Sequence, residues 1–297
     1  MTYKDNGKER TGKLIILTIA AAAAVILAVR PDIRYLAEDA LTHIGVKGEL
    51  TAEPRTPELE AGLREYSLEE LRQDPAVTVD QSLLLINLEN RLSEDFAADV
   101  AVYKDSDVQM NRCMHDAYAD LSAAVKEKFG ESLFVMSAYR TEEEQEKEIE
   151  ENGDLAAEEG ASEHQAGLAL DVYIRFYAGS GFLKTDVGQW VNSNCWKYGF
   201  IIRYPYYGEK ETGIPYEPWH LRYVGAPHAE IIHKNRLTLE SYMEMLEIGN
   251  FYRYGEFLIT RQEEEPLILP EAFSSVVLSP DNQGGWIAAV EMESDSR

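Results

Sequence analysis

The sequence predicts an α+β protein in which a small, mainly antiparallel sheet is flanked by helices. Residues 168–174 place apolar side chains at every second position, which predicts a strand. Residues 108–129 instead carry apolar side chains at helical spacing, which predicts a helix. Three short apolar segments near the C-terminus favour β structure, namely 257–259, 275–278 and 286–290. With a turn at 281–285, they predict a small β-rich extension at residues 248–297.

The other elements of the main domain, residues 81–247, follow from the same two patterns. We expect strands at 82–87, 133–138 and 200–204, and helices at 142–151, 190–198 and 229–246. The helix at 142–151 is so highly charged that most of its surface should face solvent. Gln145 is the residue of that helix that could face a cleft.

The N-terminus carries a membrane signal. Residues 14–29 form an apolar run bracketed by Lys13 and Arg30. As a helix the run spans about 24 Å, and snorkelling of the flanking cations would extend it toward the ~30 Å of a hydrocarbon core. We therefore expect a transmembrane anchor at 13–30, preceded by a cytoplasmic tail at 1–12 that is rich in basic residues. A cleaved signal peptide is the alternative, although an Arg-Pro pair directly after the run is a poor cleavage context.

The segment at 31–80 is expected to be a helical stalk or linker. A helix at 31–48 ends at glycines, and the polar, proline-containing stretch 49–57 follows it. Ser67 opens a capping-box sequence, Ser-Leu-Glu-Glu, and Pro75 stops the short helix that it starts. Its expected role is to space the main domain from the membrane.

Charge and cysteine content exclude several classes of protein. The chain has 28 basic and 53 acidic residues, a net charge of −25, so nucleic-acid phosphates would be repelled. The same balance argues against a basic membrane-surface patch. Cys113 and Cys195 lie far apart and form no zinc-binding pair. Buried thiols are slightly favoured over a disulfide between them.

The stretch from Ser162 to Asp171, Ser-Glu-His-Gln-Ala-Gly-Leu-Ala-Leu-Asp, is the one around which the chain is organised. Strand alternation places Asp171 on the face opposite the leucines, where a buried carboxylate needs a partner. His164 lies upstream, and Gly167 allows the backbone to bend between the two. A cation held by His164 and Asp171 would satisfy both side chains. A solvated strand edge with a surface histidine is the alternative that these residues leave open.

A second stretch, Glu217-Pro-Trp-His220, follows a run of turn signals. His220 would complete a set of two histidines and one carboxylate. Three protein ligands with a fourth position open to water is the usual arrangement of catalytic zinc. Glu217 is then a candidate general base for the metal-bound water. The alternative for Glu217 is an exposed loop carboxylate, a common fate in a chain this acidic.

The pattern Ser-x-His-x-x-Gly-x-Ala-x-Asp followed by Glu-Pro-Trp-His resembles the zinc D-alanyl-D-alanine carboxypeptidases of the VanY type, which belong to the LAS-type peptidoglycan metallopeptidases. The resemblance covers roughly residues 83–246. It includes further segments, namely Ser137–Arg140 with Gln145, Tyr198–Phe200, Arg203–Pro205, Thr212–Gly213 and Arg222–Gly225. Ala138 stands where glycine is more usual and Thr141 where serine is. Every ligand and base position is intact.

The resemblance implies a role for each site residue. The side chains that would hold Zn²⁺ are His164, Asp171 and His220. Glu217 would take a proton from the attacking water and deliver it to the leaving amine. Arg140 would stabilise the oxyanion or bind the substrate carboxylate, because a guanidinium pairs with carboxylates in a bidentate way. A structural ion pair is the alternative for Arg140. Weaker candidates for substrate contacts are Ser162, Gln145 and Tyr139.

The resemblance also implies an activity and a location. We expect a D,D-carboxypeptidase that removes the terminal D-alanine from peptidoglycan stem peptides, zinc-dependent, anchored in the cell membrane by one helix and facing outward. Its partners would be stem peptides and the membrane, with no nucleic acid, and the protein is expected to be a monomer. An L,D-carboxypeptidase or a cross-link endopeptidase remains an alternative. A non-catalytic wall-binding module is a further one, against which the intact Glu217 argues.

Overall fold

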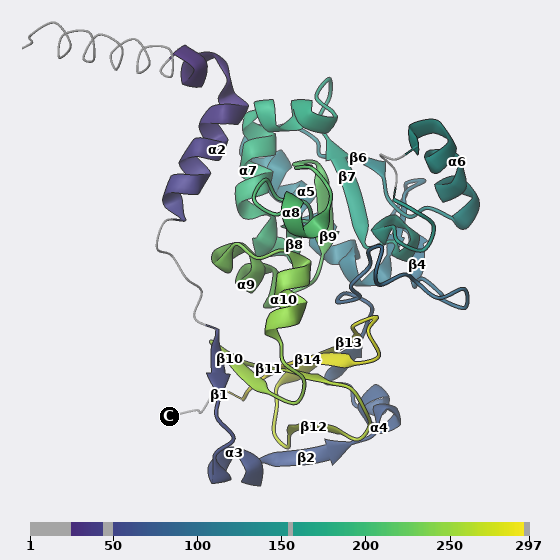
Figure 1. Ribbon diagram of the computed structural model, residues 1–297, viewed down its shortest axis with the longest axis vertical. Helices are drawn as coiled ribbons and strands as arrows, with labels where there is room; N and C mark the ends of the chain where they lie inside the picture. Colours follow the sequence, from purple (N-terminus) through teal and green to yellow (C-terminus); the bar gives the residue numbers. More distant parts are fainter. Residues whose placement is uncertain (1–24, 44–49, 154–156, 294–297) are drawn as a thin grey trace, which may run out of the picture.

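The structure, a computed structural model, describes residues 25–43, 50–153 and 157–293 (Figure 1). Most of the anchor expected at 13–30 lies outside these residues. Within the described ranges, no helix combines the length and apolar character needed to cross a membrane. The described chain folds into a mixed α+β main domain and a β-rich unit that lies beside it.

The main domain is built on one sheet with the strand order β6-β7-β9-β8, in which every neighbouring pair is antiparallel. Its strands are β6 Phe134–Ser137, β7 Ala169–Tyr173, β8 Phe200–Ile202 and β9 His220–Tyr223. One face packs against helices α5, His115–Phe129, and α7, Asp186–Asn194, through a continuous apolar core. Leu170 and Val172 contribute to that core, so Asp171 between them faces the other way, as the alternation predicts. The mainly antiparallel sheet flanked by helices is therefore observed.

Shorter elements connect this sheet. The remaining helices of the described main domain are α6 Glu142–Asn152, α8 Glu209–Thr212, α9 His228–Asn235 and α10 Leu239–Met245. Short 3₁₀ helices occur at η1 Arg112–Met114, η3 Glu163–Ala166, η4 Gly179–Lys184 and η5 Cys195–Tyr198. A hairpin of β4, Val100–Val102, and β5, Gln109–Asn111, precedes α5.

Several expected elements differ from the observed ones. The helix expected at 190–198 begins earlier, at Asp186, and is followed by η5 after Asn194. The helix expected at 108–129 begins only at His115, because β5 and η1 occupy its first part. The helix expected at 229–246 is divided: Arg236 adopts a left-handed φ of 52°, and the Thr238 hydroxyl caps α10 by accepting from the Ser241 amide at 3.0 Å. The stretch 82–87 is buried but irregular rather than a strand.

The β-rich unit draws on both ends of the described chain. Its larger sheet has the order β1-β10-β11-β14-β13-β3, with the β13–β3 pair parallel and the others antiparallel. The strands are β1 Thr51–Glu53, β3 Val77–Val79, β10 Phe251–Tyr254, β11 Phe257–Gln262, β13 Ser275–Pro280 and β14 Trp286–Glu291. A second layer pairs β2, Leu63–Tyr66, with β12, Leu267–Pro270, and includes the short helices α3, Pro57–Ala61, and α4, Leu68–Gln73.

This topology changes the interpretation of residues 51–79. They were expected to belong to a stalk or linker, yet β1 and β3 join the six-stranded sheet of the C-terminal segment and β2 pairs with its strand β12. One face of that sheet packs on the main domain through Ile259 and Ile287, while Leu258 and Val290 face the β2–β12 layer. The expected linker and C-terminal extension are therefore two parts of one folded unit. The Ser67 cap is observed, since its hydroxyl accepts from the Glu70 amide at 3.2 Å.

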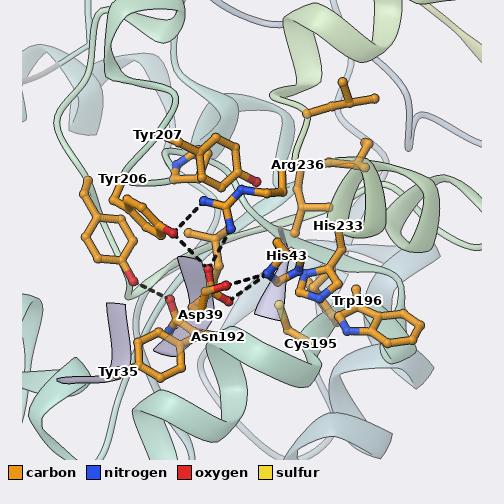
Figure 2. Close-up of a pocket in the computed structure, with 17 residues that line it drawn as sticks. Tyr35, Asp39, His43, Asn192, Cys195, Trp196, Tyr206, Tyr207, His233 and Arg236 are labelled. Carbon is orange, nitrogen blue, oxygen red and sulfur yellow. Dashed lines mark hydrogen bonds and ion pairs between the residues drawn. The ribbon is translucent and has the colours of Figure 1, made fainter. Parts of the chain in front are cut away.

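Helix α2, Pro31–Thr42, packs along the main domain beside α7 rather than standing free (Figure 1). Asp39 accepts hydrogen bonds from Arg236 at 3.0 Å and from the Tyr206 hydroxyl at 3.1 Å, and His43 lies edge-on to His233 (Figure 2). The Ser193 hydroxyl donates to that of Tyr35 at 3.0 Å. These contacts fix the segment that directly follows the expected anchor onto the main domain.

Candidate active site

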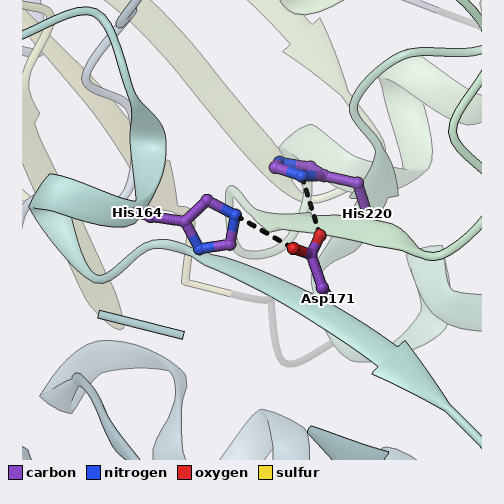
Figure 3. A group of neighbouring side chains, drawn as sticks. All are labelled: His164, Asp171 and His220. Atoms are coloured by element: carbon purple, nitrogen blue, oxygen red, sulfur yellow. Dashed lines mark ion pairs between the residues drawn. The ribbon is translucent and has the colours of Figure 1, made fainter. Parts of the chain in front are cut away.

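The three expected ligands converge on one side of the main sheet. His164 lies in η3, Asp171 at the centre of β7 and His220 at the start of β9. Asp171 and His220 are direct partners across the β7–β9 pair, so their side chains lie on the same face. One ligand atom from each residue lies within 4.8 Å of the other two (Figure 3). The sequence expectation that these residues are neighbours is therefore met.

His164 is held in a defined orientation. Its Nδ1–H donates to the Ala138 carbonyl at 2.6 Å, which leaves the Nε2 lone pair directed at Asp171 Oδ2, 3.5 Å away. Gly167 ends the η3 turn with a left-handed φ of 67° and returns the chain into β7. Burial is the largest influence on the His164 pKa and lowers it, so the ring is kept neutral and available as a ligand.

His220 faces the site with Nδ1, whereas His164 faces it with Nε2. Nδ1 lies 3.1 Å from Asp171 Oδ1 and 3.7 Å from Glu217 Oε2, and Nε2 points away, 3.5 Å from Glu163 Oε2. Burial lowers the pKa of His220, but the contacts with Asp171 and Glu163 outweigh it and raise that pKa to about 10. The site therefore holds positive charge strongly, in the form of a proton where no metal replaces it.

Asp171 is suited to a cation. Its side chain is only 13% exposed, and among the described residues its buried Oδ1 has no hydrogen-bond partner. Burial alone would raise the Asp171 pKa, but the two imidazoles hold it below its usual range. An ionised carboxylate with an unsatisfied oxygen between two imidazoles matches the donor set of a mononuclear zinc site. The residues present thus fit Zn²⁺.

Glu217 lies at the rim of this group. Its side chain is 28% exposed, and its backbone is fixed because its amide donates to the Tyr204 carbonyl at 3.0 Å. Burial raises the Glu217 pKa, while His220 lowers it and Asp171 raises it further, with a net upward shift. A carboxylate close to the ligands with a raised pKa is suited to moving protons near neutral pH.

Arg140 lies on the other side of the ligands. Its guanidinium donates to the Ser137 hydroxyl at 3.1 and 3.2 Å and to Gln145 Oε1 at 3.0 Å, and it lies 3.9 Å from Asp171 Oδ2. Gln145 is buried and donates in turn to the Ala157 carbonyl at 2.7 Å. Both polar ends of Gln145 are thus occupied, so it supports Arg140 rather than facing an open cleft.

The two remaining candidates differ in accessibility. Tyr139 lies with Arg140 on the wall of a polar pocket that also includes Arg91, Ser93 and Gln165. Ser162 precedes η3 and is buried, with 4% of its surface exposed. Tyr139 is therefore placed to reach a molecule in that pocket, and Ser162 is much less accessible.

One buried cluster beside the site was not expected. Glu163 Oε1 accepts from Arg203 Nε and from Arg222 Nη1, each at 2.6 Å, and both arginines are buried. Arg203 also forms a two-point contact with Glu240, at 2.8 and 2.5 Å. Burial alone would raise the Glu163 pKa, but the two guanidinium groups hold it below its usual range. The sequence signal was Glu163 itself, directly beside the candidate metal ligand His164.

The two cysteines are not part of the site. Cys113 and Cys195 both carry free thiols in the described chain, and Cys195 is buried. Burial raises the pKa of the Cys195 thiol to about 12, so it stays protonated and unreactive. The expectation of buried thiols rather than a disulfide is confirmed for Cys195, whereas Cys113 is only partly buried.

Fold and site together have the arrangement of a metallohydrolase, in which two histidines and one aspartate converge on an antiparallel sheet and a further carboxylate lies beside them. A family model described as VanY, D-alanyl-D-alanine carboxypeptidase, matches residues 107–226. The putative carboxypeptidase YodJ of Bacillus subtilis (strain 168) is 36% identical over 185 residues, which are 56% of this chain and 68% of that protein. The chain belongs to this VanY-type family of zinc carboxypeptidases.

Two further comparisons bear on the assignment to this family. A D-alanyl-D-alanine carboxypeptidase of Enterococcus faecium is 35% identical over 196 residues, and the match spans 59% of this chain and 63% of that enzyme. The solved structure of the LD-carboxypeptidase LdcB is 33% identical with a TM-score of 0.52, covering 59% of this chain and 93% of that one. The family thus includes relatives named for cleavage after either a D- or an L-residue.

Proposed function

We propose that this protein is a zinc-dependent D,D-carboxypeptidase that removes the C-terminal D-alanine from peptidoglycan stem peptides. The observation that carries the proposal is the position of Glu217 Oε2, 3.7 Å from His220 Nδ1, beside the convergent His164, Asp171 and His220. Binding alone would not need an acid–base carboxylate at that place. Membership of a family of D-alanyl-D-alanine carboxypeptidases supplies the substrate class.

The proposed chemistry divides between the metal and the chain. When bound by His164, Asp171 and His220, zinc would polarise the scissile carbonyl and make water a better nucleophile. Glu217 would remove a proton from the attacking water and then deliver it to the leaving amine. Its raised pKa brings the carboxylate closer to the working pH, which favours both transfers.

Arg140 would bind the substrate carboxylate or the developing oxyanion. Its Nε–H and one N–H of each terminal nitrogen are directed at Ser137 and Gln145, and these bonds fix the plane of the guanidinium. The N–H groups that remain can pair with an anion at the edge of the ligand group. Tyr139, on the same pocket wall, would contact the substrate, and Ser162 and Gln145 would support the site from behind.

An L,D-carboxypeptidase is the second candidate, because the chain is also 33% identical to LdcB, which is named as an LD-carboxypeptidase. Incubating the purified protein with defined tetrapeptides and pentapeptides, with and without a chelator, separates the two. We expect the protein to release D-alanine from the pentapeptide, and we expect this activity to be lost when the chelator removes zinc. Cleavage of the tetrapeptide alone would favour the L,D assignment, and internal cuts in cross-linked dimers would favour an endopeptidase.

We also propose that residues 13–30 anchor the protein in the cell membrane with the main domain outside. The apolar run and its basic flanks support this. Proteolysis of intact cells checks it: the main domain should be accessible, and the mature protein should keep its first 30 residues. Protection of the main domain, or a mature N-terminus within residues 20–32, would contradict the proposal.

A further inference from the structure

Glu163 uses its two carboxylate oxygens differently. Oε1 receives both arginine hydrogen bonds, at 2.6 Å each, whereas Oε2 has no hydrogen-bond partner among the described residues. Oε2 lies 3.5 Å from His220 Nε2, and that nitrogen is likewise buried without a hydrogen-bond partner in the described chain. Two unsatisfied buried polar atoms of complementary type therefore face each other behind the ligand group.

The need to neutralise Arg203 and Arg222 does not explain why Glu163 Oε2 faces His220. Arg203 already has Glu240 as a two-point partner, and Arg222 donates to the carbonyls of Ser82 and Leu84 at 2.9 and 2.8 Å. Both arginine bonds converge on Oε1, so they fix the carboxylate while leaving Oε2 aimed at His220. The two arginines thus fix the orientation of the Glu163 carboxylate, with Oε2 toward the His220 imidazole.

We infer that Glu163 is a positioning residue of the metal centre. Its Oε2 accepts the Nε2–H of His220, which fixes the tautomer whose Nδ1 lone pair faces Asp171. Metal-binding histidines commonly donate their second ring N–H to a carboxylate, which sets ring orientation and raises ligand basicity. This inference rests on the metal-binding role proposed for His220 and adds a residue for which no role was expected.

Glu163→Gln tests the tautomer directly. The amide oxygen can stay on the arginines, but the amide nitrogen then faces His220 Nε2 and donates to it. The imidazole must respond by carrying its proton on Nδ1, where it blocks the metal. We expect the affinity for zinc, measured by competition with a chromophoric chelator, to fall about 10- to 100-fold.

Glu240→Gln is the matched control. It removes the same charge from the same arginine cluster, but Glu240 contacts Arg203 and Asn87 and not His220. We expect its zinc affinity to stay within about threefold of the parent protein. A second variant, Glu163→Asp, keeps the charge but withdraws the carboxylate by one methylene, and it should also lose affinity. It covers the case in which Glu163→Gln does not fold.

The outcomes separate this inference from the proposed function. Absence of tight zinc binding in the unsubstituted protein would overturn the proposed function itself. Zinc binding by both Glu163 variants as tight as by Glu240→Gln would overturn only the positioning role. As a second readout, the visible spectrum of the cobalt-loaded protein should change for Glu163→Gln, because the ligand field reports loss of His220, and should not change for Glu240→Gln.

A second, independent observation lies on the same face of the sheet. Phe134 and Tyr173 are direct partners across the β6–β7 pair, with ring centroids 5.4 Å apart and planes 30° apart. Tyr173 follows Asp171 by two residues, so both side chains lie on the face that carries the ligands. Phe134 keeps 44% of its surface exposed, which is unusual for a phenylalanine in a strand.

The pair and Arg140 lie on opposite sides of Asp171. Ser137, which binds Arg140, pairs with Asp171 at the end of β6, and the chain then continues to Arg140, whereas Phe134 lies at the other end of β6. A peptide whose C-terminal carboxylate is at Arg140 would therefore extend its upstream residues toward the rings. Tyr173 lies two strand positions beyond Asp171, about 7 Å, which matches one to two residues of an extended peptide.

We propose that Phe134 and Tyr173 form a subsite for the residue that precedes the attacked D-alanine, given the carboxypeptidase function proposed above. In a stem peptide this is the diamino acid, whose long side chain ends in an ammonium group. The methylenes can lie on the ring faces, and the cation gains from contact with an aromatic face. The occupant is thus the peptide part of the substrate rather than its sugar chain.

Two pentapeptides test the subsite, one with the diamino acid and one with alanine at that position. We expect Phe134→Ala and Tyr173→Leu each to lower kcat/KM for the first peptide about 5- to 10-fold and to leave the second unchanged. Ile248→Ala, at a residue 49% exposed on the segment leading to β10, is the control and should affect neither.

Other results have distinct meanings. Equal losses on both peptides would show that the rings only stabilise the sheet edge and would overturn the subsite. Losses that appear only with glycan-linked substrates would assign the rings to sugar instead, which also overturns it. No cleavage of either peptide by the unsubstituted protein would contradict the proposed carboxypeptidase function rather than the subsite.

Discussion

A proton-transfer role for Glu217 can be separated from a ligand role by changing its carboxylate to an amide. Glu217→Gln keeps the size and hydrogen bonding of the side chain but cannot accept a proton at neutral pH. Because three other side chains would hold the metal, we expect zinc content and melting temperature to stay near those of the parent. Turnover of a pentapeptide should fall at least ~10²-fold, the typical cost of a lost general base.

Asp171→Asn is the companion measurement. It removes the charge between the two imidazoles, so zinc stoichiometry should fall first and activity with it. If Glu217→Gln lost zinc as Asp171→Asn does, Glu217 would be a ligand. If it kept full turnover, another group would be the base.

At the scale of single residues, the convergence of His164, Asp171 and His220 was predictable because they lie in two short motifs. His164 and Asp171 share one stretch, and His220 lies in another with Glu217. Glu163 stands inside the first motif, yet its partners Arg203 and Arg222 are 40 and 59 residues away. No local pattern links them, so their cluster became visible only in the fold. His228 is likewise buried, against Tyr242 on the following helix.

At the scale of elements, the turn that joins η3 to β7 depends on Gly167. Its φ is +67°, and an added Cβ would lie 2.6 Å from a Val100 methyl and 3.0 Å from the Asn111 amide nitrogen. Gly167 also connects η3 to β5, since its carbonyl accepts a hydrogen bond from the Asn111 amide at 2.9 Å. The position of His164 relative to Asp171 therefore depends on the absence of a side chain here.

Gly167→Ala should be destabilising and should disturb the metal site. The left-handed conformation alone costs about 1–2 kcal/mol for a residue with a Cβ, and the contact with Val100 adds to it. Gly130→Ala is the control, because Gly130 has a similar φ of +72° but open space around its Cβ position. Chemical denaturation should show a larger loss for Gly167→Ala, with weaker zinc binding only in that variant. Equal losses of stability in the two variants would mean that the structure relieves the contact with Val100 at no cost.

Strands and helices with many residues were easier to predict than short ones. The alternation in β7 and the apolar stripe of α5 each extend over enough positions to show their period. β1 and β3 have three residues each, too few for a period to be seen. Their membership of a sheet depends on partners about 200 residues away, such as Arg253 for Thr51. That pairing is a tertiary effect which local propensity does not encode.

At the scale of the whole molecule, the chain enters the β-rich unit, leaves it to build the main domain and returns to complete it (Figure 1). The sheet of that unit packs on the main domain near α9 and α10 through an apolar cluster that includes Ile232, Tyr242 and Ile259. The main domain is thus fixed to the β-rich unit on one side and to α2 on another. Both contacts lie away from His164, Asp171 and His220. They therefore hold the main domain in place without covering these three residues.

This topology predicts which N-terminal truncations the protein tolerates. Removing residues 1–49 deletes α2 and leaves β1, β2 and β3 in place. Removing residues 1–80 looks equally harmless if that segment is a stalk, but it also deletes those three strands. It would remove Tyr66 and Leu71, both buried, from a core that they share with Leu258 and Val290. Each such side chain contributes about 1.5–3 kcal/mol when buried.

We therefore expect the shorter truncation to keep its fold, with a modest fall in melting temperature because the Asp39 contacts are lost. The longer truncation should be insoluble or melt more than about 10 °C lower, since several kcal/mol are lost at ~2–4 °C per kcal/mol. It also leaves β10 and β13 as unpaired edges, which favours aggregation. Thermal melting and light scattering of the two proteins, side by side, give the answer. Equal stability would mean that residues 51–79 are dispensable and act only as a spacer, as the sequence alone suggested.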